Sequence, residues 1–121
     1  MNEASLSDSL SKAGAKAMPG LVDFKHFDRV TEGMPDRSWT WGGRTVWLEL
    51  KYHGGQPSPA QIVTMRLLAR AGMAYYIRFD YHLREPVTLI IHPTGRLEVQ
   101  IPGHDVRKTA DWIRKKIEEL R

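Results

Sequence analysis

A pair of adjacent glycines, Gly42 and Gly43, divides a stretch of strand-like sequence into two arms, and this pair constrains the fold more than any other feature. Two consecutive glycines readily supply the positive φ angles of a tight two-residue hairpin turn. The segment from residue 36 to residue 51 therefore predicts an antiparallel hairpin in which residues whose numbers sum to 85 lie opposite each other. In this register Asp36 faces Glu49.

Alternation along the second arm places aliphatic side chains on one face of the sheet and charged side chains on the other. The aliphatic face carries Val46, Leu48 and Leu50, joined by Trp39 and Trp41 of the first arm. The opposite face gathers Asp36, Glu49 and Lys51. This prediction depends on the register, because a slip of one residue would move Asp36 to the apolar face.

The polar face has the composition of a cation site that handles phosphate. Directly opposed side chains have Cβ atoms roughly 4.5 to 5.5 Å apart, so the carboxylates of Asp36 and Glu49 could share one ion. Mg²⁺ prefers such oxygen ligands, and it can polarise a phosphoryl oxygen and activate water. Lys51 could orient that water or neutralise charge on the phosphate. The alternative is a solvated strand with a weak surface ion pair, since E-x-K is common by chance.

The remaining sequence alternates between helical and strand-like segments. Residues 5–17 predict a helix capped by Ser5, and Ser58 with Pro59 begins a second helix that Gly72 ends. Because a strand follows this helix directly, the succession indicates a parallel crossover. The other predicted elements are strands at residues 23 or 24 to 30, 73–79, 87–92 and 96–101, and a helix at residues 105–120.

Composition fits one α/β domain. The 121 residues are 41% hydrophobic and 26% charged, which is typical of a globular protein. Without cysteine the chain can form neither a disulfide nor a thiolate zinc site. A net charge of +4 suits a polyanionic partner. No apolar run is long enough to span a bilayer and the start lacks a signal-peptide pattern, so the expected location is cytoplasmic.

Three motifs, in this order, resemble the PD-(D/E)xK nuclease superfamily. They are G-M-P-D at residues 33–36, E-L-K at residues 49–51 after the glycine turn, and S-P-A-Q at residues 58–61. Residues 24–79 are most similar to small VRR-NUC-type and phage-type nucleases, and more distantly to archaeal-type Holliday junction resolvases. The resemblance implies a restriction-endonuclease-like core, a central mixed β-sheet flanked by helices in the order α-β-β-β-α-β, here followed by a C-terminal β-hairpin and helix within a single nuclease domain, residues 1–121.

The resemblance also implies roles for individual residues. Asp36 and Glu49 would bind Mg²⁺ or Mn²⁺ with help from the Leu50 carbonyl, and Lys51 would be the catalytic lysine. Gln61 matches a glutamine that often lies near the active site in these nucleases, although its position three residues after Ser58 also completes a capping box. Many family members use a further acid from the first helix, for which Glu3 and Asp8 are both candidates.

The predicted function is that of a Mg²⁺-dependent DNA endonuclease that recognises structure, such as a branched or Holliday junction, more than sequence. The basic residues predicted to contact the DNA backbone are Lys25, Arg29, Arg37, His53 and Arg66. Two symmetric cuts require two active sites, so a homodimer is expected. The alternatives are a nucleic-acid-binding module of the same fold without hydrolysis, and a nuclease subunit that depends on a partner.

Overall fold

The computed structural model describes residues 2–26 and 33–120, in which six strands form one mixed sheet. The helices are α1 (Glu3–Ala17), α2 (Pro59–Ala71) and α3 (Val106–Glu119). The strands are β1 (Val22–Lys25), β2 (Arg37–Trp41), β3 (Arg44–Tyr52), β4 (Met73–Asp80), β5 (Val87–Ile91) and β6 (Leu97–Pro102). Among the described residues, no helix is both long enough and apolar enough to cross a membrane.

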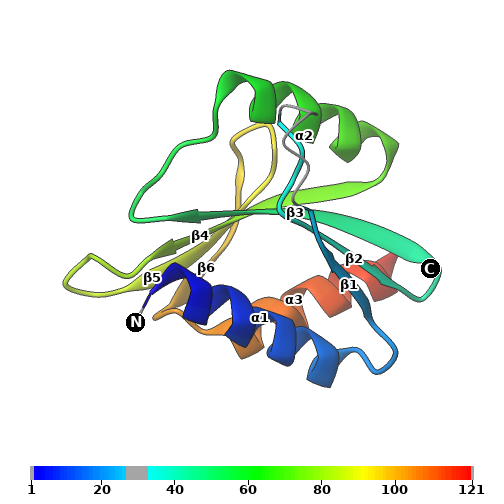
Figure 1. Ribbon diagram of the computed structural model, residues 1–121, viewed down its shortest axis with the longest axis horizontal. Helices are drawn as coiled ribbons and strands as arrows, with labels where there is room; N and C mark the ends of the chain where they lie inside the picture. The colour runs from blue at the N-terminus through cyan, green and yellow to red at the C-terminus, as the bar shows by residue number, and fades with distance from the viewer. Residues whose placement is uncertain (1, 27–32, 121) are drawn as a thin grey trace.

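The strands lie in the sheet in the order in which they occur in the chain, from β1 to β6. All neighbours are antiparallel except β3 and β4, which α2 connects as a parallel crossover, as the sequence predicts. Helix α2 covers one face of the sheet, while α1 and α3 lie together on the other face (Figure 1). The protein is therefore α/β, with a mixed sheet between two helical layers.

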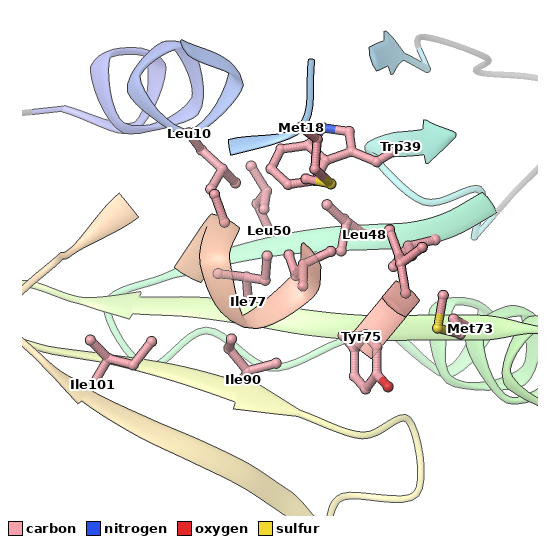
Figure 2. Packing of buried hydrophobic residues seen from close by; sticks show 14 of the residues in the cluster. Leu10, Met18, Trp39, Leu48, Leu50, Met73, Tyr75, Ile77, Ile90 and Ile101 are labelled. Atoms are coloured by element: carbon pink, nitrogen blue, oxygen red, sulfur yellow. The ribbon is translucent and has the colours of Figure 1, made fainter. Parts of the chain in front are cut away.

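The larger hydrophobic core fills the space between the sheet and the layer of α1 and α3. Trp39, Leu48 and Ile77 point from three adjacent strands into this core, and Leu10 enters it from α1 (Figure 2). The absence of a side chain at Gly14 lets α1 pack against the Trp39 ring, because a Cβ there would lie 2.7 Å from the ring. A smaller cluster beneath α2 contains Met65, Ala74 and Tyr76, with Trp47 packed against it.

The hairpin register that Gly42 and Gly43 predict is confirmed. Trp41 pairs with Arg44, and the pairs whose numbers sum to 85 continue to Arg37 and Leu48. Both glycines have positive φ angles, 61° and 78°. Counting from the turn, the last paired residue of β2 is Arg37, so the ladder stops one residue short of Asp36.

Several boundaries differ from the predicted ones. Helix α1 begins at Glu3 and its cap is Asn2, whose Oδ1 accepts a hydrogen bond from the N–H of Ser5 at 2.8 Å, so the prediction that Ser5 caps the helix was wrong. Strand β1 ends at Lys25, and residues 27–30 of the predicted strand lie outside the described residues. Strand β4 runs one residue further than predicted, to Asp80.

Candidate functional site

Two carboxylates meet where the pairing of β2 with β3 ends. The backbone N–H of Asp36 donates to Glu49 Oε1 at 3.1 Å, and Asp36 Oδ2 accepts from the N–H of Leu50 at 2.8 Å. On the other side, the N–H of His26 donates to the Asp36 carbonyl at 2.8 Å. Asp36 is therefore held between the chains of β1 and β3, with its side chain beside Glu49.

Glu49 is buried although it is ionisable. Its side chain is only 1% exposed, and Oε2 has no hydrogen-bond partner among the described residues. Burial raises the pKa of the Glu49 carboxyl from 4.5 to about 8; a side-chain hydrogen bond and the charge of Asp36 add to the rise, and Lys51 opposes it. Lys51 Nζ lies 3.5 Å from Glu49 Oε2. The site thus favours a proton or a cation between its two carboxylates.

The structure distinguishes the two acids of the first helix. Glu3 and Asp36 both line a depression of about 290 Å³ between α1 and the end of the sheet. Burial, followed by the charges of Asp36 and Glu3, raises the pKa of the Tyr52 phenol to about 12. Asp8 instead forms an exposed ion pair with Lys25, with Nζ and Oδ1 3.5 Å apart. Glu3 is therefore the first-helix acid that shares a depression with Asp36.

Gln61 lies in the first turn of α2, where its side chain forms the predicted capping box. Gln61 Oε1 accepts from the N–H of Ser58 at 3.0 Å, and Ser58 Oγ accepts from the N–H of Gln61 at 3.2 Å. Gly33 brings the chain that precedes Asp36 onto the same helix, because a Cβ there would lie 2.6 Å from the Ala60 carbonyl oxygen. These contacts give Gln61 a structural role in the cap of α2.

Arg37 does not occupy the surface position expected of a DNA contact. It is 2% exposed, and one guanidinium nitrogen donates to both carboxylate oxygens of Asp23 at 3.0 Å. The other nitrogen donates to the carbonyl and the hydroxyl of Ser7 on α1. The alternation of β2 explains this: Arg37 shares a face with Trp39, and that face lies beneath α1. We therefore assign Arg37 to the packing of α1 on the sheet.

The other predicted basic contacts lie in different parts of the structure. Lys25 lines the same depression as Asp36, and Arg66 lines a separate pocket beneath α2. His53 is exposed beyond the end of β3, where its ring packs edge-on against Tyr81 with 4.0 Å between ring centroids. Arg29 lies outside the described residues.

Strand β4 supplies polar residues that the sequence analysis missed. In the parallel register Glu49 pairs with Tyr76 and Lys51 with Arg78, so these side chains share the face beneath α2. Asp80 holds Arg78 through an Nε–Oδ2 contact of 3.0 Å, and its other oxygen accepts from the N–H of Gly54 at 2.6 Å. The sequence could have indicated this, because the charged Arg78 and Asp80 alternate with Ile77 and Phe79 in β4.

The donors of the carboxylate pair fit a hard divalent cation. Mg²⁺ is commonly bound by one or two carboxylates, with water and substrate phosphate completing its coordination. Asp36 is exposed, and the buried Glu49 Oε2 accepts no hydrogen bond from the described residues although Lys51 Nζ lies 3.5 Å away, so the pair has carboxylate oxygens that an ion could share. Within residues 2–26 and 33–120, no group of three or more histidine, aspartate or glutamate side chains is placed to bind a metal by itself. An ion at this pair would therefore need further ligands from water, from substrate, or from a backbone carbonyl such as that of Leu50.

Comparison with known proteins adds no assignment. No protein-family model matches the chain, and no curated protein matches it.

Proposed function

We propose that this protein is a structure-selective DNA endonuclease, which hydrolyses phosphodiester bonds at the Asp36–Glu49 pair with Mg²⁺ or Mn²⁺ as cofactor. The observation that carries the proposal is the buried Glu49 carboxylate, joined to Asp36 on one side and to Lys51 on the other. Two carboxylates in contact are unfavourable at neutral pH unless a proton or a cation lies between them. The parallel β3–α2–β4 unit, preceded by α1 and an antiparallel hairpin, supports a restriction-endonuclease-like core.

In this reaction the side chains of the protein would bind the cation and place a positive charge beside the phosphate. Asp36 and Glu49 would hold the cation, which when bound supplies Lewis-acid polarisation of the phosphoryl oxygen and lowers the pKa of a bound water. Lys51 is held beside Glu49, where it offsets the negative charge that grows on the phosphate as water attacks phosphorus and the P–O bond breaks. The hydrogen bond from Leu50 fixes the orientation of the Asp36 carboxylate.

The surroundings of the pair suit a polyanion. Lys25 lies in the depression on the α1 side, and Lys51, Arg66 and Arg78 lie in the pocket on the α2 side. Cations on both sides can hold the backbone of a strand that crosses the carboxylate pair. Symmetric cutting of a branched junction needs two such sites, so a homodimer is the assembly that we propose for that substrate.

The test compares single substitutions on supercoiled, branched and single-stranded DNA with Mg²⁺. We expect Glu49→Gln and Asp36→Asn to abolish cutting, and Lys51→Ala to lower its rate by about 100-fold or more. Glu85→Gln and Lys115→Ala, which replace exposed residues of the same types, serve as controls and should cut like the wild type. Equal cutting by all variants would refute the proposal. Binding of DNA by the wild type with no metal-dependent cutting of any substrate would favour the non-hydrolytic binding module.

A further inference from the structure

A pocket of about 300 Å³ lies beneath α2, beside the carboxylate pair. Lys51 belongs to both sites, because its Nζ is 3.5 Å from Glu49 Oε2 and its side chain lines the pocket. The pocket is bounded by β3 and β4, by the first turns of α2, by the loop before α2 and by the turn between β5 and β6. It is therefore an extension of the candidate site, built from these five parts of the chain.

Three cations line this pocket. Arg78 is oriented by Asp80, with Nε 3.0 Å from Oδ2, which leaves its terminal nitrogens for another partner. Arg66 donates from Nε to the carbonyl of Pro93 at 3.4 Å, and no salt bridge engages it within the described part of the chain. Lys51 is the third. Their carboxylate neighbours are Glu49 and Asp80, so the lining keeps an excess of positive charge.

The pocket also has apolar walls and one unused hydrogen-bonding group. Pro57 and Ile62 line it on the α2 side, and Ile91 and Pro93 on the side of β5 and the following turn. Tyr76 lines its inner part and is 5% exposed, yet its hydroxyl has no partner in the described residues. A buried hydroxyl without a partner costs free energy unless a ligand or water satisfies it. Cations, aliphatic walls and one free hydroxyl together fit a phosphate joined to an aromatic ring.

We propose that this pocket binds one unpaired nucleotide of a DNA strand, with its phosphate on Lys51, Arg66 and Arg78 and its base between the apolar walls. This inference rests on the proposed function and specifies its substrate. A volume near 300 Å³ is at the lower end of small-molecule sites, so it accepts a single nucleotide unit and excludes a base pair. DNA with unpaired nucleotides at a branch, flap or end is therefore the substrate class, and fully paired duplex is not.

The test measures binding without cutting, by fluorescence anisotropy of a labelled eight-nucleotide oligo(dT) and of a duplex of equal length, with EDTA present. We expect the single strand to bind about tenfold more tightly than the duplex. Arg66→Ala should weaken oligo(dT) binding about tenfold, whereas Arg70→Ala, one turn further along α2 and outside the pocket lining, should weaken it less than about threefold. Tyr76→Phe should also weaken binding while the melting temperature stays the same or rises, because the hydroxyl has no partner to lose.

Competition identifies what the pocket recognises. Thymidine monophosphate should displace oligo(dT) at concentrations at which inorganic phosphate does not. Equal displacement by the two, equal binding of single strand and duplex, or equal effects of Arg66→Ala and Arg70→Ala would each overturn the proposal. Because all these measurements are made in EDTA, they can fail while the Asp36 and Glu49 variants still abolish metal-dependent cutting, and they can succeed if the nuclease proposal fails.

Discussion

The two faces of the sheet are built from the same alternating strands but have opposite characters. The face beneath α1 and α3 carries a continuous apolar core in which Trp39, Leu48 and Ile77 are completely buried. The face beneath α2 has only a small apolar cluster, and next to it lie Glu49 and Lys51. Both faces hold a buried charged group, but the Arg37 guanidinium beneath α1 is paired with Asp23, whereas the Glu49 carboxyl beneath α2 has its pKa raised by burial and costs stability when it is ionised.

Replacing one tryptophan on each face gives the largest expected contrast. Trp39→Ala removes a completely buried ring from the main core and should lower the free energy of unfolding by about 3–5 kcal/mol. Trp47→Ala, on the α2 face, removes a ring that is only partly buried and should cost less. Denaturant unfolding of both variants measures the difference. An equal loss for the two would show that the faces contribute alike to stability.

Divalent cations should stabilise the protein through the Asp36–Glu49 pair alone. With free Mn²⁺ or Mg²⁺ at 100 times its dissociation constant, a single site adds about 2.7 kcal/mol to the free energy of unfolding. Removing the ion with EDTA should therefore lower the melting temperature of the wild type but leave that of Asp36→Asn unchanged. An equal ion-dependent shift in both proteins would place metal binding elsewhere in the chain.

The pH dependence of stability should sharpen the same contrast. Because burial raises the pKa of Glu49 to about 8 from 4.5, the folded protein binds more protons than the unfolded chain between these pH values. Without metal, this carboxyl therefore makes the free energy of unfolding fall as pH rises from about 4.5 to 8, by at most about 1.4 kcal/mol per pH unit. Glu49→Gln should lack this part of the slope and be more stable than the wild type at pH 8. Parallel pH profiles for the two proteins would contradict the assignment.

Local chemistry accounts for the features that the sequence predicted best. The register of the β2–β3 hairpin follows from two glycines, which occupy positive φ angles, and the cap of α2 follows from Ser58 and Gln61 three residues apart. Both depend on contacts between residues close in the chain. The alternation of β3 likewise predicted that Glu49 and Lys51 share a face, and it could have predicted the same for Tyr76, Arg78 and Asp80.

Contacts between distant segments account for what the sequence analysis missed. The sequence indicated that Arg37 is a surface cation. In the structure α1 covers it, and its guanidinium donates to Asp23 and to Ser7 of α1. The placement of the same helix distinguishes the two acids of its first turns: Glu3 lines the depression that contains Asp36, while Asp8 forms an ion pair with Lys25. A sequence pattern gives the periodicity of a helix but not the direction in which its N-terminus approaches the sheet.

The sequence by itself therefore determined the α/β class, the hairpin register and the meeting of Asp36 with Glu49, because turn geometry and strand alternation act over a few residues. Only the tertiary structure decided which residues surround this pair. The parallel register of β3 with β4 brings Lys51 beside Arg78, and the packing of α2 adds Arg66 and closes the pocket. The physical reason is that a pocket requires walls from segments far apart in the chain, and their relative positions depend on how the two faces of the sheet are covered.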